Sequence, residues 1–145
     1  MRPAAEVKRI LIKRWLDKAD SDLQVARALF SEKQTFYEIT CFHSQQAVEK
    51  CLKAYLTDQQ IEFPKTHDIE ELLELVATAD PKLADSLRPA APLTVYAIDS
   101  RYPGNFPESK REDARRVIEL AEKAREALTR KIKGRFPRVI QKNRK

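Results

Sequence analysis

The sequence has few of the residues that break or cross-link a chain. Only two glycines and two cysteines occur among its 145 residues. Because tight turns often need glycine, this scarcity favours a few long helices over a fold with many turns. No apolar run approaches the ~20 residues that a membrane-spanning helix needs, and the first residues show no signal-peptide pattern. We therefore expect a cytoplasmic protein without a membrane association.

The small number of cysteines and histidines also limits the chemistry. Cys41 and Cys51 lie in one predicted helix, where ten residues correspond to about 15 Å of rise. A disulfide needs Cα atoms within about 7 Å of each other, so we expect two free thiols. Two cysteines and two histidines are also a poor set for a zinc site of the usual kind. We expect neither a metal nor another cofactor.

Positive charge is concentrated at the C-terminal end. The net charge is +6, yet residues 130–145 carry eight Lys or Arg and no acid, which leaves 20 basic against 22 acidic residues before them. The total charge therefore does not indicate a uniform nucleic-acid-binding face. The length suits one domain, which we place at residues 5–133, followed by a basic, flexible tail at 134–145. Such a tail either binds RNA or DNA through phosphate contacts or only increases solubility.

Helical periodicity runs through most of the chain and predicts its fold. Apolar residues recur at three- and four-residue steps from Ile12 to Phe30, and again in a helix that should begin at a Thr35–Glu38 capping box and end near Gln60. Shorter helices should follow the caps Asp68 and Asp80, with a break at Pro89 and Pro92. A last long helix should begin at a Ser109–Glu112 capping box and stop at Gly134 and Pro137. We therefore predict an all-α fold, an antiparallel up-and-down bundle of four to five helices, three of them long.

The second predicted helix carries a polar stripe opposite its apolar side. At 100° per residue, its members share an arc of roughly 100°. Either this stripe is a solvated face, or it lines a cleft or a dimer groove where two lysines attract phosphate and a histidine titrates near neutral pH. Within the apolar side, we expect Ser44 to allow close packing and Gln45 to make a buried hydrogen bond. The stripe consists of His43, Gln46, Glu49, Lys50 and Lys53.

Two further residues on predicted loops are candidates for ligand contacts. His67 precedes the third helix, where it either hydrogen bonds to a backbone carbonyl and fixes the connection or takes part in a site. Arg101 lies between two helices, where its guanidinium either binds a phosphate with two hydrogen bonds or pairs with Asp99 or Glu108. Together with its neighbour Tyr102, Arg101 completes the set of predicted ligand-binding residues, and Arg101 is the one candidate for catalysis.

Four segments together resemble the HEPN domain family, a small helical domain associated with nucleotide and RNA chemistry. The resemblance covers about residues 12–132, and the order and spacing of the segments carry it. The segments are Trp15-Leu16-Asp17-Lys18-Ala19-Asp20-Ser21-Asp22-Leu23, Gln46-Ala47-Val48-Glu49-Lys50-Cys51-Leu52-Lys53-Ala54, Thr66-His67-Asp68 and Ser100-Arg101-Tyr102-Pro103.

The resemblance implies a helical bundle that forms a homodimer. In many members two copies bring Arg and His pairs to a shared cleft that cleaves RNA without a metal, and a minimal nucleotidyltransferase is a frequent partner. In this chain Arg101 matches the arginine, but Phe106, Pro107 and Glu108 occupy the positions where the histidine would stand. An acid does not replace imidazole as proton donor and acceptor near pH 7 without a large pKa shift.

Three functions remain open at this point. The first is a module that binds a nucleotide, RNA or a nucleotidyltransferase partner in a toxin–antitoxin or stress-response system, without an intact Arg-x4-6-His motif. The second is an active, metal-independent ribonuclease toxin with a rearranged site. The third is a purely structural helical adaptor. The missing histidine favours the first, and we expect no enzyme.

Overall fold

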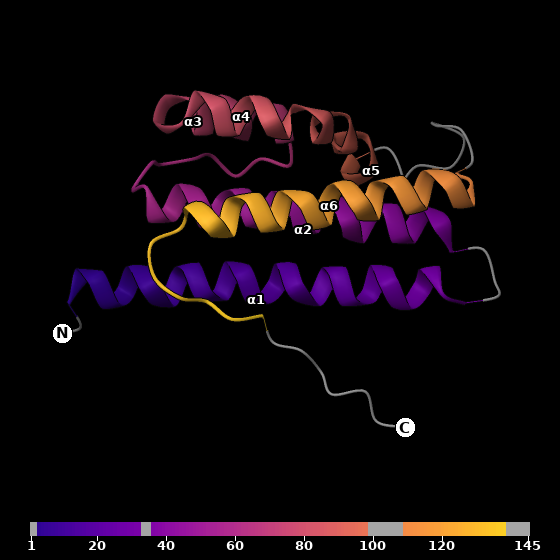
Figure 1. Ribbon diagram of the computed structural model, residues 1–145, viewed down its shortest axis with the longest axis horizontal. Coiled ribbons are helices and arrows are strands. Elements are labelled where there is room, and N and C mark those ends of the chain that lie inside the picture. The colour runs from indigo at the N-terminus through magenta and orange to yellow at the C-terminus, as the bar shows by residue number, and fades with distance from the viewer. Residues whose placement is uncertain (1–2, 33–35, 99–108, 139–145) are drawn as a thin grey trace, which may run out of the picture.

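The computed structural model describes residues 3–32, 36–98 and 109–138. Within these ranges it contains helices and no strand, and three of the helices are long (Figure 1). They are α1 (Ala4–Phe30), α2 (Tyr37–Asp58) and α6 (Arg111–Lys131). Between α2 and α6 lie α3 (Ile69–Ala79), α4 (Pro81–Leu87), the 3₁₀ helix η1 (Arg88–Thr94) and the single turn α5 (Val95–Ile98). The predicted all-α bundle is confirmed.

Helix α2 lies at the centre of the bundle. It runs antiparallel to α1 and packs against α6, while α3 and η1 cover another of its sides (Figure 1). The predicted apolar stripe of α1 faces α2, since Ile12, Leu16 and Leu23 are all buried. Because α2 has neighbours on several sides, it buries polar side chains as well as apolar ones. This position explains why its polar stripe does not lie in solvent.

Most of the predicted breaks between helices are confirmed. The Asp68 side chain caps α3 by accepting a hydrogen bond from the Glu70 N–H at 3.0 Å, and Asp80 caps α4 by accepting one from the Leu83 N–H at 3.1 Å. Pro92 lies within η1, where the chain departs from α-helical geometry as the prolines predict.

Two predicted caps differ from the structure. The capping box at Ser109 and Glu112 is wrong by one residue: Asp113 accepts a hydrogen bond from the Lys110 N–H at 2.9 Å, while Glu112 pairs with Arg115 instead. Helix α2 begins after Phe36, which makes no side-chain cap, and the predicted cap Thr35 lies outside the described residues. The helix ends at Asp58, two residues before the predicted end.

After α6 the chain turns back and lies against α1. Gly134 makes this turn with φ +97°, a left-handed conformation that favours glycine. The Arg9 guanidinium lies 4.4 Å from the centre of the Phe136 ring and donates a hydrogen bond to the Arg135 carbonyl at 3.1 Å. Residues 134–138 of the predicted tail therefore contact the bundle, whereas 139–145 lie outside the described residues.

Both cysteines are buried free thiols, as predicted. Burial raises the pKa of Cys41 to about 11 and that of Cys51 to about 12, since an apolar surrounding disfavours the thiolate. Neither thiol is therefore suited to act as a nucleophile near neutral pH.

Candidate functional site

The polar stripe of α2 is a network of internal contacts, and its interpretation as a solvated face is wrong. Glu49 and Lys53 are 3% and 6% exposed, while His43, Gln46 and Lys50 are partly buried. The stripe divides into two clusters, one between α2 and the loop before α3, the other between α2 and α1.

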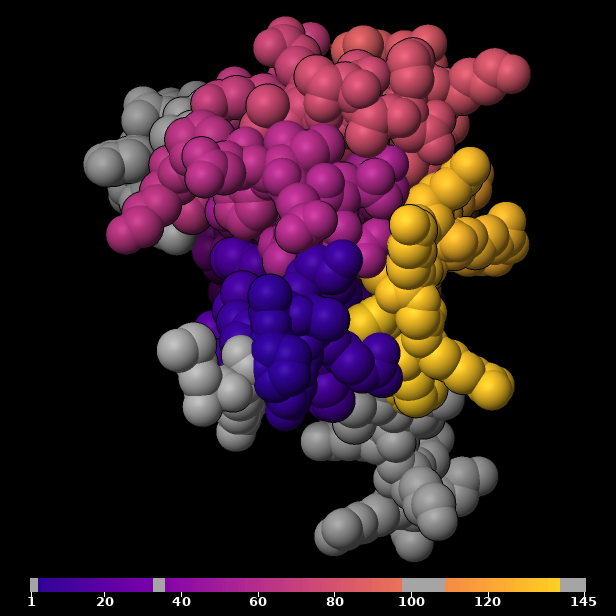
Figure 2. All heavy atoms as spheres, turned by 90° about the vertical axis from the view of Figure 1, so that its left-hand side faces the viewer, coloured from indigo at the N-terminus to yellow at the C-terminus, as the bar shows by residue number. Residues whose placement is uncertain are grey.

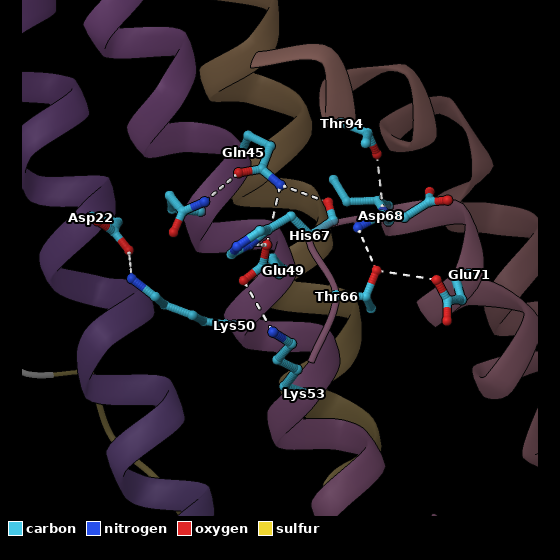
Figure 3. A network of polar contacts seen from close by, with 12 residues as sticks. Asp22, Gln45, Glu49, Lys50, Lys53, Thr66, His67, Asp68, Glu71 and Thr94 are labelled. Carbon is cyan, nitrogen blue, oxygen red and sulfur yellow. Dashed lines mark hydrogen bonds and ion pairs between the residues drawn. The ribbon is translucent and has the colours of Figure 1, made fainter. Parts of the chain in front are cut away.

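Glu49 is the centre of the first cluster (Figure 3). One of its oxygens lies 2.8 Å from His67 Nδ1, and the other accepts a hydrogen bond from Lys53 Nζ at 3.2 Å. Gln45, which is fully buried, donates to the His67 carbonyl at 3.3 Å and accepts from Gln46 at 2.7 Å. The predicted buried hydrogen bond of Gln45 is confirmed. His67 fixes the connection before α3, but its ring does so through Glu49 rather than through a backbone carbonyl.

Two aromatic rings complete the surroundings of Lys53. Its ammonium group lies 5.5 Å from the Trp15 ring centre and 6.0 Å from that of Phe63, and these two rings contact each other edge to face. Such rings attract a cation through their electron-rich faces, most strongly where water is excluded. A phosphate that approached Lys53 would have to displace both Glu49 and this aromatic cover. Lys53 is therefore placed to orient Glu49.

Asp22 of α1 is the centre of the second cluster. His43 Nδ1 lies 2.9 Å from one Asp22 oxygen, and Lys50 Nζ lies 2.5 Å from the other. The side chains of Asp22, Lys50 and His43 are 12%, 20% and 26% exposed, so this cluster reaches the surface. Asp22 neutralises Lys50 and fixes the orientation of the imidazole, which joins α1 to α2.

Both histidines have the same arrangement of ring nitrogens. Each Nδ1 faces a carboxylate, and no described residue hydrogen bonds to either Nε2. A carboxylate on Nδ1 holds an imidazole in the orientation and tautomer that acid–base catalysis uses. The His67 side chain is 56% exposed and that of His43 26%, so His67 is the more accessible imidazole. The clusters thus hold two oriented imidazoles at the edge of a buried network.

The predicted site residues Arg101 and Tyr102 lie outside the described residues. The residues that flank this segment, up to 98 and from 109, are described. Tyr96 and Ser109 lie beside the Cys41 thiol near the start of α2, and Arg111 stacks on the Phe30 ring at 4.3 Å. Cys41 is two residues from His43 and eight from Glu49 along α2. Thr94, just before α5, accepts a hydrogen bond from the Ile69 N–H at 3.0 Å, so the described flanks of the Arg101 segment contact both the start of α2 and the start of α3, which follows His67.

The sequence prediction did not include the carboxylates of α1. Asp20 is buried and pairs with Arg125 of α6 through two hydrogen bonds, of 2.5 and 3.1 Å. It stands four residues after Leu16, next to the apolar stripe, and an acid at such a position is a signal of a buried ion pair. Asp22 stands next to the same stripe, three residues after Ala19, and its partners His43 and Lys50 lie on α2.

Two other kinds of site have no candidate in the described part of the chain. No group of three His, Cys, Asp or Glu side chains there is arranged to hold a metal ion. No described helix is both long and apolar enough to cross a membrane.

Comparison with known proteins places the chain in a family. The HEPN domain family matches residues 12–132. The fold is similar to that of ST0689, an archaeal HEPN homologue, with a TM-score of 0.65 and 29% identity over 84% of this chain and 98% of that one. It is also similar to TT1696 from Thermus thermophilus, with a TM-score of 0.65 and 26% identity over 83% and 98% of the two chains. No curated protein sequence shows significant similarity. From the match over residues 12–132, the chain belongs to the HEPN domain family.

Proposed function

We propose that this protein is a HEPN module that binds a nucleotide or RNA without cleaving it. The observation that carries the proposal is the occurrence of Phe106, Pro107 and Glu108 after Arg101, where a ribonuclease motif would need a histidine. Both histidines of the chain are held by carboxylates elsewhere, Asp22 for one and Glu49 for the other.

Within this proposal, the predicted site residues have two different tasks. The exposed or partly exposed groups, His43, Lys50 and His67, contact the ligand together with Arg101 and Tyr102. The buried groups, Glu49 and Lys53, orient them, and Gln46 supports this network through Gln45. This division follows the exposed fractions, since a side chain closed to solvent is also closed to a phosphate.

The binding proposal is tested by thermal unfolding in the presence of nucleotides and of single-stranded RNA. A ligand that binds only the native state raises the melting temperature. We expect such a shift for the wild type and its loss in Arg101→Ala. Arg116→Ala is the matched control, because Arg116 is an exposed arginine of α6. No shift with any nucleotide or RNA, or an equal loss in the control, would contradict the proposal.

The protein acts as a homodimer with a small nucleotidyltransferase as partner, in a toxin–antitoxin or stress-response system. This part of the proposal is supported by family membership. Light scattering of the purified chain measures the dimer, and co-expression with the product of an adjacent reading frame tests the partner. A monomer at micromolar concentration, or an adjacent frame without such a partner, would contradict it.

A second candidate function is a metal-independent ribonuclease with a rearranged site. The orientation of His43 by Asp22 favours it, because Nε2 is then available to move a proton while Arg101 stabilises charge on the phosphate. In that case the purified protein should cut RNA in the presence of a chelator. Cleavage should disappear in both His43→Ala and Arg101→Ala, and an inert wild type would rule this candidate out.

A further inference from the structure

A hollow of about 220 Å³ lies at the C-terminal end of α2. Three parts of the chain enclose it: the first turns of α1, the last residue of α2 and the segment that returns after α6. Figure 2 views this end of the bundle and shows the residues that follow α6, in yellow, lying against the start of α1, in indigo. The lining residues are Ala5, Lys8, Arg9, Ile12, Asp58, Lys133, Gly134 and Phe136.

Asp58 gives this hollow an unused hydrogen-bond acceptor. Asp58 is 6% exposed, and its Oδ2 accepts hydrogen bonds from the Lys133 N–H at 3.3 Å and from Gln59 Nε2 at 3.2 Å. Its Oδ1 is buried and has no partner among the described residues. A buried polar atom without a partner lowers stability, so native proteins rarely retain one without a use. The geometry therefore favours a ligand that brings a hydrogen-bond donor to this oxygen.

Three basic residues and an aromatic ring also line the hollow, beside apolar residues. Lys8 donates a 3.4 Å hydrogen bond to the Asp58 carbonyl, and the Lys133 side chain is exposed at the rim. The guanidinium of Arg9 stacks on the Phe136 ring. A matching ligand thus carries an anionic group for the lysines, a planar group for the Arg9–Phe136 pair and a donor for Asp58.

We propose that the hollow binds one ribonucleotide of a single-stranded RNA. Its phosphate contacts Lys8 and Lys133, its base stacks against the Arg9–Phe136 pair, and a ribose 2′-hydroxyl donates to Asp58 Oδ1. Carboxylates recognise ribose hydroxyls in this way in dinucleotide sites. The volume is below the ~300 Å³ of typical small-molecule pockets, so the hollow holds the ribose while the phosphate and the base contact its edge.

Access to Asp58 Oδ1 requires a small movement, because that atom is buried. The long side chain of Lys8 is held by a single hydrogen bond and can turn toward a phosphate at the rim. The inference rests on RNA binding as the proposed function, and it adds a site at the opposite end of α2 from the flanks of the Arg101 segment.

Fluorescence anisotropy with a labelled single-stranded RNA and the DNA of the same sequence tests the proposal. The wild type should bind RNA about tenfold more tightly, as expected for one hydrogen bond to a charged group. Asp58→Asn removes the negative charge, and its NH₂ can only donate to the oxygen of the 2′-hydroxyl, in a weaker, neutral hydrogen bond. Loss of the charge strengthens the binding of both strands, so the readout is the ratio of RNA to DNA affinity, which should fall in this variant. Equal binding of RNA and DNA by the wild type would overturn the proposal.

Charge variants separate this site from the one that contains Arg101. Lys8→Ala and Lys133→Ala should weaken RNA binding and reduce its salt dependence, whereas Lys123→Ala, an exposed lysine of α6, should leave both unchanged. If Arg101→Ala abolishes binding and the two lysine variants do not weaken it, this inference fails while the proposed function stands. If the lysine variants weaken binding and Arg101→Ala does not, the hollow binds RNA and the proposed role of Arg101 fails.

Discussion

Removing the carboxylate of Glu49 should destabilise the fold more than removing any surface carboxylate. In Glu49→Ala the Lys53 ammonium, with a side chain 8% exposed, loses its ion-pair partner. Leaving one member of a buried pair uncompensated costs about 3–5 kcal/mol. The Trp15 and Phe63 rings retain an attraction of about 1–2 kcal/mol for the ammonium, so we take the lower end of that range. At about 2–4 °C per kcal/mol for a chain of this size, the melting temperature should fall by roughly 6–12 °C.

Thermal unfolding followed by circular dichroism measures this effect, with two comparisons. Glu126→Ala removes an exposed partner of Arg130 and should change stability by less than about 0.5 kcal/mol. The double variant Glu49→Leu, Lys53→Met replaces the buried pair by apolar side chains and should recover most of the loss. A Glu49→Ala protein as stable as the Glu126→Ala control, or a double variant less stable than Glu49→Ala, would refute the view that Lys53 needs Glu49.

Three further results follow from the same structure. Arg125→Leu should cost about 3 kcal/mol in chemical unfolding, because the buried Asp20 then loses both hydrogen bonds from Arg125 and retains, of its described partners, only Arg138, 3.8 Å away, and a loss below about 1 kcal/mol would contradict this. The free energy of unfolding should fall by about 1.4 kcal/mol per pH unit per thiol above pH 9, because the unfolded state releases the thiol protons while the raised pKa values of Cys41 and Cys51 keep them in the native state. Urea unfolding at several pH values should show a smaller dependence on pH in Cys51→Ala. An unchanged dependence would contradict the assignment of this effect to the buried thiols. Gly134→Ala should lower stability by about 1–2 kcal/mol and make hydrogen exchange faster in residues 132–138. Residue 134 has a left-handed backbone conformation, and a Cβ added there would lie 3.2 Å from the Arg9 guanidinium. Unchanged exchange would contradict this.

The fold could be predicted from the sequence because its signals are local. The apolar stripe from Ile12 to Phe30 and the caps at Asp68 and Asp80 depend on residues within one or two turns. The cap of α6 lies one residue later than predicted, because Asp113 accepts the hydrogen bond from the N-cap residue Lys110. Lysine is not among the usual N-cap residues, so the sequence pattern favoured Ser109 and Glu112 instead.

The polar network could be predicted only in part, because its partners come from distant segments. The stripe on α2 follows from its periodicity, but its burial depends on α1 and on the loop before α3, which the pattern does not place. Asp22 lies 28 residues from Lys50, and His67 lies 18 from Glu49. The Asp58 hollow has the same origin, since Lys133 is 75 residues away from Asp58.

The most direct test of the proposed function is to incubate the purified protein with labelled single-stranded RNA in the presence of a chelator. The bound fraction and the length of the recovered RNA are then measured in the same sample. We expect a complex that retains full-length RNA and that is weakened by Arg101→Ala and not by Arg116→Ala. Shortened RNA, or no complex at all, would contradict it.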